Sequence, residues 1–257
     1  MEVSPDPWID ALRHSHDTLR ANVEPLDADH LQQQSYPSEW SIAQVLSHLG
    51  SGAQIFAMFL DAGLSGAEPP GQAAFPPIWE AWNARSPQAQ AADGLTADGE
   101  LVERFESLDA DQRDRVRLKL FGMDLDITGL ARMRLSEHAI HTWDVAVALD
   151  PAATVAADAV GLLIDTLDQV AGRTAKTDGR QLRLCVSTTS PERHFLLETG
   201  ATLTLVAAGQ DDSLPQLRLP AEAFVRLVYG RLDAAHTPAV ETKQVGLDEL
   251  RAIFPGL

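Results

Sequence analysis

The first 150 residues place apolar side chains at helical spacing. Residues 8–23 have polar positions between apolar ones, and the stretch after Ser41 continues a 3.6-residue apolar period as far as Leu60. Ser41 and Gln44 have the spacing of a capping box, which predicts that a helix begins directly after Ser41. Glycines at 63 and 66 interrupt the pattern. The sequence therefore predicts a long amphipathic helix that starts at residue 42 and buries one face.

More helices are predicted in this half of the chain, over residues 78–92, 96–108 and 128–148. Residues 63–77 contain four prolines and three glycines, which predicts a loop that covers a site or contributes to one. The stretch 109–123 is charged at first and then apolar, and it fits no element. Asp150–Pro151 ends the last helix, because the residue before a proline disfavours helical geometry.

The pattern changes after Pro151. One more helix is predicted over residues 157–170, followed by β-like runs at 182–187, 194–197 and 202–207. Turn residues at 190–191 and 209–212 predict hairpins between strands. Short helices are predicted at 221–228, where Gly230 ends the pattern, and at 247–253. We therefore expect an α+β protein with a helical bundle in residues 1–150 and a smaller α/β domain in residues 151–257.

Charge and composition then exclude several classes of protein. The chain has 20 basic and 37 acidic residues, a net charge of −17 and no Lys/Arg-rich run, so we expect neither nucleic acid nor a membrane surface as a partner. The one cysteine, Cys185, rules out an intrachain disulfide and predicts a buried thiol. The N-terminus lacks a signal-peptide pattern, and no apolar stretch reaches the ~18–20 residues of a membrane span. These features predict a cytoplasmic protein and leave its oligomeric state open.

A carboxylate and an imidazole share one side of the helix predicted over residues 128–148. Glu137 and His141 are four residues apart, and Asp144 lies three residues further on, so all three point to nearly the same side. Unpaired charge facing a bundle core is costly, and a bound divalent cation would compensate it. The alternative interpretation is a solvent-facing Glu–His pair, which would have no chemical role.

His48 adds a third donor from a second helix, at or within its apolar face. A lone histidine there is often a core residue with satisfied hydrogen bonds. However, two ligands at i and i+4 plus one from a neighbouring helix is how bundles build metal sites. Two histidines and one glutamate also form a known ligand set for catalytic zinc. His138 is a rival ligand that is rotated by about 100° from Glu137, and His14 and His16 are expected at the surface.

Arg231 is the candidate anchor for an anion. It directly follows the glycine that ends a predicted helix, in a chain that has few positive charges. An arginine in this position could hold a carboxylate of a substrate through several hydrogen bonds. An ordinary surface arginine is the alternative.

Three motifs together resemble the mycothiol-dependent maleylpyruvate isomerase family. Residues 40–49 match its pattern W-[ST]-x-x-[DEQ]-[VL]-[LV]-x-H-[LV]. The run Glu137-x-x-x-His141-x-x-Asp144 resembles its second metal motif. Residues 228–231, which end in Gly-Arg, resemble the close of a helix in its sterol-carrier-like C-terminal domain. The three motifs occur in the family's order and span nearly the whole chain.

The resemblance implies a fold and a site. The N-terminal domain would be a DinB-like four-helix bundle that binds a divalent metal, usually zinc, through His48, Glu137 and His141. Arg231 would correspond to the family's important arginine, in a cleft between the bundle and the C-terminal domain. The thiol cofactor would be mycothiol, the low-molecular-weight thiol of actinobacteria.

The expected function is thiol transfer to a small electrophile, or isomerisation of one, in a metal-dependent enzyme. Arg231 would bind the cofactor or an anionic group of the substrate. Asp144 would orient a ligand histidine or act on a proton, and its place one turn from His141 favours the orienting role. Two alternatives stay open: a thiol-independent zinc hydrolase or lyase, and a non-catalytic protein that binds a small ligand. The same ligand set also suits non-haem iron.

Overall fold

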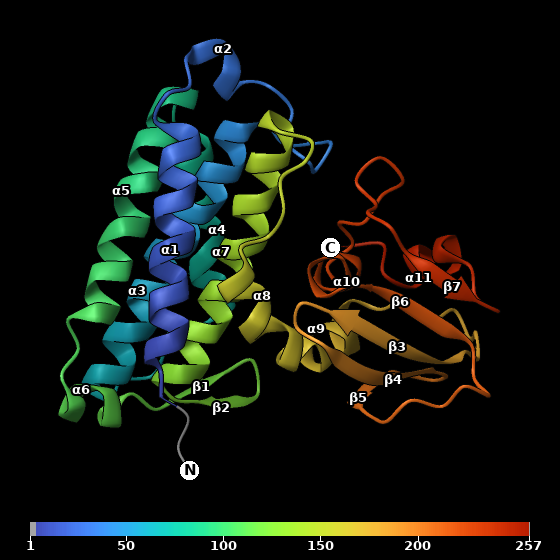
Figure 1. Ribbon diagram of the computed structural model, residues 1–257. Coiled ribbons are helices and arrows are strands. Elements are labelled where there is room, and N and C mark those ends of the chain that lie inside the picture. The colour runs from blue at the N-terminus through green and yellow to red at the C-terminus, as the bar shows by residue number, and fades with distance from the viewer. Residues whose placement is uncertain (1–3, 257) are drawn as a thin grey trace. The chain divides into compact units, whose positions relative to one another are not determined.

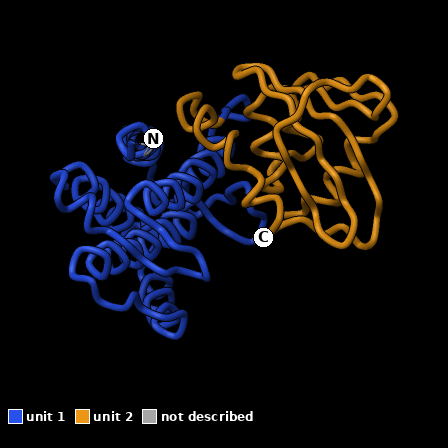
Figure 2. Tube along the Cα trace, turned by 90° about the horizontal axis from the view of Figure 1, so that it is seen from below, with its two compact units in different colours: residues 1–154 blue, residues 155–257 orange. Residues whose placement is uncertain are grey.

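A computed structural model describes residues 4–256 of the chain. The chain divides into two compact units, Met1–Thr154 and Val155–Leu257, which Figure 2 shows in different colours. We describe each unit by itself. The fold is α+β, with a helical bundle in the first unit and a sheet with helices in the second (Figure 1). This agrees with the fold class that the sequence predicts.

Four long helices form the bundle of the first unit: α1 (Asp6–Val23), α3 (Ile42–Ser65), α5 (Pro87–Glu106) and α7 (Ile127–Leu149). Shorter elements connect them: α2 (Ala28–Leu31), η1 (Gln72–Ala74), α4 (Phe75–Asn83), α6 (Ala110–Arg115), β1 (Leu118–Leu120) and β2 (Met123–Leu125). Apolar side chains of α1, α3, α5 and α7 fill the space between the helices.

Helix α3 begins where the sequence predicts. The Ser41 hydroxyl accepts a hydrogen bond from the Gln44 backbone, and the Gln44 side chain accepts one from the Ser41 backbone. Gly66 closes the helix with φ of 71°, a left-handed conformation that glycine adopts without a steric penalty. Helix α7 likewise covers the predicted residues 128–148. Its N-cap is Asp126, whose carboxylate accepts from the Gly129 backbone.

The predicted boundary between the two middle helices is wrong. The break lies at residues 84–86, because Ser86 caps α5 through the Ala89 backbone and Pro87 occupies the first turn. Gly94, which falls between the two predicted helices, instead lies inside α5 at a close crossing with α3. A Cβ atom on Gly94 would lie 2.6 Å from the Leu46 carbonyl oxygen.

Two other predictions for the first unit also need correction. The loop predicted over residues 63–77 is shorter, since α3 continues to Ser65 and α4 begins at Phe75. The stretch after Asp109, which fits no element in the sequence, forms α6 and an antiparallel hairpin of β1 and β2. Strands of three residues are too short to leave a clear alternating pattern.

The second unit contains a five-stranded sheet in the order β5-β4-β3-β6-β7. Its strands are β3 (Arg183–Thr189), β4 (Arg193–Thr199), β5 (Leu203–Ala207), β6 (Gln216–Pro220) and β7 (Glu241–Lys243). The first three cover the predicted β-like runs, and residues 190–191 form the predicted hairpin turn. Residues 209–212 do not form a hairpin, because β6 pairs in parallel with β3. Strands β6 and β7 were not predicted.

Helices α8 (Ala157–Leu163), α9 (Leu167–Thr174), α10 (Ala221–Val228) and α11 (Leu247–Ile253) complete this unit, with η2 (Ile164–Thr166) between the first two. The prediction of a single helix over residues 157–170 is therefore wrong, whereas α10 and α11 match their predicted ranges. Gly230 follows α10 with φ of 70°, and a Cβ atom there would lie 2.2 Å from the Gly256 nitrogen. The Gly-Arg turn thus packs directly against the last residues of the described chain.

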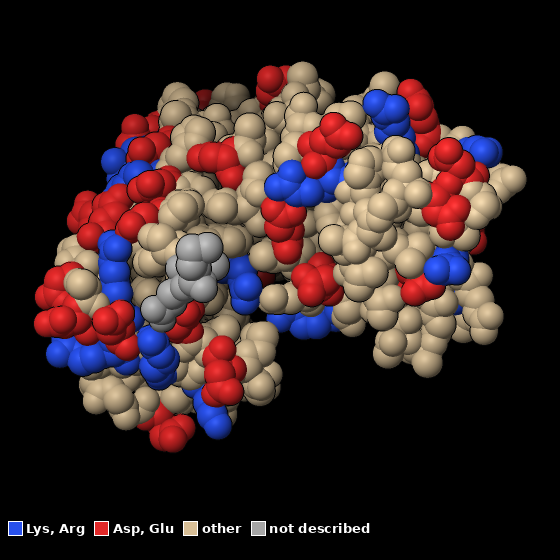
Figure 3. Space-filling view, turned by 60° about the horizontal axis from the view of Figure 1, so that its bottom comes forward, with Lys and Arg blue, Asp and Glu red and all other residues tan. Residues whose placement is uncertain are grey.

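The acidic composition is visible at the surface. On the face in Figure 3, basic side chains lie among acidic ones and form no continuous basic patch. Among residues 4–256, no helix is both long enough and apolar enough to cross a bilayer.

The crossing at Gly94 generates a stability prediction. We expect Gly94→Ala to lower the free energy of unfolding of the first unit by ~1–3 kcal/mol, because the added methyl group meets backbone that cannot rotate away. The matched control is Thr96→Ala, an exposed position on the same helix, which should change stability by less than ~0.5 kcal/mol. Urea unfolding followed by circular dichroism measures both. Equal stability of the two variants would contradict this account of the crossing.

Candidate functional site

The structure brings His48, Glu137 and His141 together. His48 lies on α3, and the other two lie one turn apart on α7. One possible ligand atom of each residue lies within 4.8 Å of those of the other two. The Glu137 Oε2 atom is 3.5 Å from His48 Nε2 and 3.8 Å from His141 Nε2. The three donors therefore lie around a common point, and only the fold brings His48 to the pair on α7.

The donor set is partly open to solvent. The side chains of His48 and Glu137 are 35% and 45% exposed, whereas that of His141 is 9% exposed. A small molecule can therefore reach the donors from one side. A closed structural site would instead surround its ion with four protein ligands.

Asp144 fixes the orientation of His141. Its Oδ2 atom is 2.9 Å from His141 Nδ1, and the Asp144 side chain is fully buried. A carboxylate is only an acceptor at neutral pH, so His141 Nδ1 donates to Asp144 and Nε2 faces Glu137. A metal-binding histidine is commonly oriented in this way, by a carboxylate on its second nitrogen.

Trp40 covers the histidines of this site. The centroid of its ring lies 5.1 Å from that of the His48 ring and 6.0 Å from that of the His141 ring. The Trp40 and His141 rings are stacked. The loop before α3 is held against α7, because the Tyr36 backbone donates to the Asp144 carbonyl oxygen at 3.1 Å. The segment that caps α3 thus also places an indole over the site.

The protonation states of the cluster suit a cation. Burial lowers the pKa of His48 and outweighs the opposing effect of Glu137. Burial tends to raise the pKa of Glu137, but the hydrogen bond from His48 and the nearby charge of His141 lower it overall. At neutral pH the cluster therefore offers an ionised Glu137 carboxylate and a neutral His48 imidazole, which are the forms of these groups that bind metals.

A divalent ion fits this donor set. Bonds of ~2.0–2.1 Å in a tetrahedral arrangement separate adjacent ligand atoms by roughly 3.3–3.5 Å. The Glu137–His48 separation of 3.5 Å matches this value, and the 3.8 Å separation from His141 needs only a small adjustment. The donor types, their spacing and the orienting carboxylate all agree with a site that holds an ion such as zinc through three residues.

Arg231 lies in the second unit, directly after the turn at Gly230. Its backbone nitrogen donates to the Arg226 carbonyl oxygen at 2.7 Å, and its Nη1 atom donates to the Tyr229 carbonyl oxygen at 2.8 Å. The side chain is half-buried. The turn therefore holds the arginine close to its own backbone, and its role toward a substrate remains a prediction.

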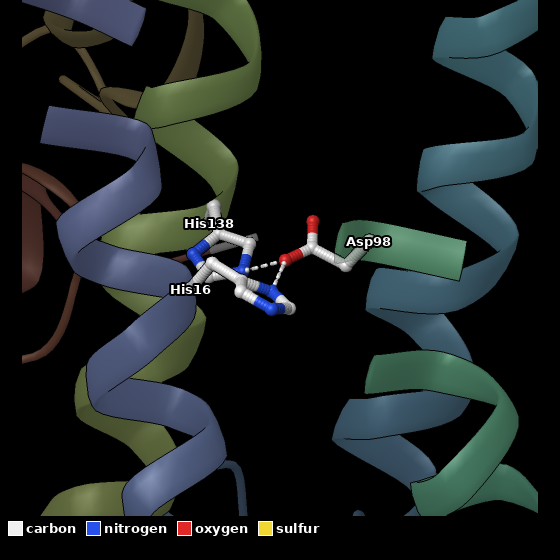
Figure 4. A group of neighbouring side chains, drawn as sticks. All are labelled: His16, Asp98 and His138. Atoms are coloured by element: carbon white, nitrogen blue, oxygen red, sulfur yellow. Dashed lines mark hydrogen bonds and ion pairs between the residues drawn. The ribbon is translucent and has the colours of Figure 1, made fainter. Parts of the chain in front are cut away.

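A second histidine–carboxylate cluster lies inside the bundle, where the sequence did not predict one. Asp98 Oδ2 is 2.6 Å from His16 Nδ1 and 2.7 Å from His138 Nε2, and all three side chains are buried (Figure 4). The other oxygen of Asp98 accepts a hydrogen bond from Arg134 Nη2 at 2.6 Å. His16 was expected at the surface, and this expectation is wrong. Ser15 beside it is also buried, and its hydroxyl lies 2.8 Å from His138 Nδ1.

The carboxylate of Asp98 stays ionised in the core. Burial alone would raise its pKa, but the nearby His138 and Arg134 hold the pKa well below its ordinary value. Burial lowers the pKa of His138 despite the nearby carboxylate. The positive charge opposite Asp98 is therefore that of Arg134, because the guanidinium keeps its proton. Asp98 lies among buried residues of α5, and this polar residue in an apolar pattern was the sequence signal that could have indicated the cluster.

Residues 12–146 match the family profile described as "Mycothiol maleylpyruvate isomerase N-terminal domain". The crystal structure of the mycothiol-dependent maleylpyruvate isomerase matches with a TM-score of 0.67 at 15% identity, over 89% of this chain and 90% of that chain. A mutant of that enzyme, with a histidine replaced by alanine, matches with the same values. At this identity the structural likeness shows the fold.

A weaker match is YfiT from Bacillus subtilis, described as a probable metal-dependent hydrolase with an unusual four-helix bundle topology. Its TM-score is 0.41 at 16% identity, over 58% of this chain and 87% of that chain. No curated protein sequence matches the chain significantly.

The buried cluster generates a pH prediction. His138 has a folded pKa below 6.5, so as the pH falls the unfolded chain binds a proton at this residue before the folded chain does. Asp98 has a folded pKa well below 3.8, so it too takes up its proton first in the unfolded chain. Both effects have the same sign. The free energy of unfolding should fall as the pH drops from about 6.5, and it should fall further below about 3.8.

Urea unfolding of the metal-free protein between about pH 8 and pH 4 measures this dependence. His138→Gln should reduce the loss of stability that begins near pH 6.5, and His14→Gln, at an exposed histidine, should leave that loss unchanged. A free energy of unfolding that is constant from pH 8 to pH 5 would contradict the assignment of a neutral, buried His138.

Proposed function

Since the chain belongs to the mycothiol maleylpyruvate isomerase family, we propose that it is a metal-dependent enzyme that uses a low-molecular-weight thiol on a small electrophile. The observation that carries the proposal is the convergence of His48, Glu137 and His141 in a partly open site. The thiol that the family name indicates is mycothiol. The reaction is either transfer of the thiol to the electrophile or isomerisation of the electrophile with the thiol as cofactor.

The proposed metal ligands are His48, Glu137 and His141, and the proposed ion is zinc. A divalent ion bound by three protein ligands acts as a Lewis acid that favours the thiolate form of an added thiol at neutral pH. Glu137 supplies the only negative charge of the donor set. Asp144 holds the proton of His141 on Nδ1 and so keeps Nε2 available as a donor atom.

Other residues around the donors shape the site. Trp40 covers the rings of His48 and His141 and shields that side of the site from water. The exposed sides of His48 and Glu137 leave space for a thiol and its partner. An activated alkene, an epoxide or a halide is the class of electrophile that a thiolate attacks.

Arg231 is proposed to hold an anionic group of the substrate or of the thiol cofactor. A guanidinium binds a carboxylate through two parallel hydrogen bonds, which a lysine cannot reproduce. In an acidic chain, an anionic substrate requires such a specific positive contact. If the thiol is mycothiol, the reaction takes place in the cytoplasm of an actinobacterium, because mycothiol is the low-molecular-weight thiol of these cells.

Metal analysis and a thiol-dependent assay test the proposal. We expect about one zinc ion per purified chain. His48→Ala should lose the ion together with the activity, since two remaining protein ligands are too few for a zinc site. His14→Ala, which removes an exposed histidine outside both clusters, should retain the ion and the activity. Full metal retention in His48→Ala would overturn the ligand assignment.

The same assay separates the proposed reaction from the thiol-independent alternatives. Purified protein is given mycothiol and a panel of electrophiles that includes maleylpyruvate, and each reaction is repeated without thiol. We expect turnover only when both thiol and metal are present. Turnover without thiol would identify a hydrolase or lyase, in which water takes the place of the thiol. Metal binding without turnover of any substrate would favour a protein that only binds a small ligand.

Arg231 provides a separate prediction. We expect Arg231→Met to lower kcat/KM for an anionic electrophile by roughly 10- to 150-fold, the effect of losing one or two hydrogen bonds to a charged group. The metal content should not change, because Arg231 is not a proposed ligand. The matched control is Arg218→Met, an exposed arginine on β6 of the same unit, which should leave kcat/KM unchanged. Equal activity of the two variants would overturn the role of Arg231.

A further inference from the structure

The buried network around Asp98 contacts all four long helices of the bundle. Asp98 belongs to α5, His16 to α1, and His138 and Arg134 to α7. Arg134 Nη2, which donates to Asp98, also donates to the Leu49 carbonyl oxygen of α3 at 2.9 Å. One guanidinium nitrogen therefore bridges a carboxylate of α5 and the backbone of α3.

The network is not arranged as a second metal site, although His16, Asp98 and His138 have donor atoms close enough for one. The contacts of 2.6 and 2.7 Å are hydrogen-bond distances, shorter than the roughly 3.3–3.5 Å between ligand atoms on a tetrahedral ion. Arg134 already neutralises the one carboxylate of the cluster. A divalent ion would add two positive charges to a buried site without an anion to balance them.

The network lies next to the proposed metal ligands along the chain. Leu49, whose carbonyl oxygen accepts from Arg134, directly follows His48 on α3. His138 directly follows Glu137 on α7. The hydrogen bond between Arg134 and Leu49 thus joins the two helices that hold all three ligands, next to His48 and one turn before Glu137.

We propose that Arg134 and Asp98 are positioning residues that set the distance between His48 on α3 and the ligand pair Glu137 and His141 on α7. This inference rests on the proposed metal centre. Asp98 on α5 orients the Arg134 guanidinium by accepting a hydrogen bond from it. The guanidinium in turn donates to the Leu49 carbonyl oxygen and so fixes the position of the α3 backbone. A metal site is sensitive to small displacements of its ligands, so a shift of one helix weakens binding without removing a ligand.

Gly52 provides a direct probe of this arrangement. It lies on α3 one turn after Leu49, and a Cβ atom on it would lie 2.9 Å from Arg134 Nη1. The contact is closer than packed atoms tolerate, and the atom that must move is the end of the arginine side chain. Gly52→Ala therefore displaces the guanidinium but removes no charge, hydrogen-bonding group or metal ligand.

The test measures binding of Co²⁺ as a spectroscopic probe of the metal centre, in the full chain. Affinity is obtained by competition with a chelator, and ligand geometry by the visible absorption of the bound ion. We expect Asp98→Asn and Gly52→Ala each to weaken Co²⁺ binding by ~10- to 100-fold, the usual effect of changing a residue that orients metal ligands. Both should also change the absorption spectrum.

The control is Val102→Ala, a fully buried position on α5 one turn from Asp98. It removes buried apolar atoms and destabilises the bundle, but it leaves the network intact, so its Co²⁺ affinity and spectrum should be those of the wild type. Urea unfolding of the metal-free variants shows which of them fold. If Asp98→Asn does not fold, Gly52→Ala still tests the inference.

Four results would overturn the inference. Wild-type Co²⁺ affinity in folded Asp98→Asn and Gly52→Ala would show that the network does not act on the ligands. An equal loss of affinity in Val102→Ala would show a general effect of stability. Two ions bound by the wild type and one by Asp98→Asn would make the network a metal site. Failure of the wild type to bind Co²⁺ would remove the proposed metal centre as well. If only His48→Ala lowers the Co²⁺ affinity, the metal centre stays in place and the inference about the network alone is overturned.

Discussion

Asp98 carries a negative charge in the middle of a helical bundle, where an unpaired charge would cost several kcal/mol. Arg134 neutralises it from α7, and imidazole nitrogens of α1 and α7 lie against its second oxygen. Each partner comes from a different point of the fold, so the carboxylate is satisfied only when the helices have their native positions. Apolar packing favours many arrangements of four helices, and this network favours one of them.

The two histidine–carboxylate clusters use the same types of residue for different purposes. In the buried cluster, the imidazole nitrogens lie 2.6–2.7 Å from the carboxylate oxygen, and a guanidinium balances the charge. In the cluster of His48, Glu137 and His141, the donors stand 3.5–3.8 Å apart and face solvent on one side. Distance and exposure, more than residue type, separate a network that holds helices together from a site suited to a cation.

The proposed chemistry also agrees with what the chain lacks. Cys185, its one cysteine, is buried on β3 of the second unit, so the proposed reaction relies on the thiol of a small molecule. The site around His48 offers one carboxylate and two imidazoles, a donor set that would leave positive charge on a bound divalent ion to stabilise a thiolate. The borrowed thiol and the open metal site are therefore two parts of one proposal.

The sequence by itself determined the α+β class and the start of α3 at its capping box, because helical periodicity and caps are local, and its motifs indicated His48, Glu137 and His141 as candidate donors. It misplaced the break before α5, and it missed the hairpin of β1 and β2 because these strands have only three residues each. It also missed β6 and β7, whose pairing depends on strands elsewhere in the chain. Only the tertiary structure decided that the buried His16 and His138 contact the Asp98 carboxylate, and that the Trp40 ring covers the candidate site. Those contacts join residues far apart in the chain, and no local pattern records which helix faces another.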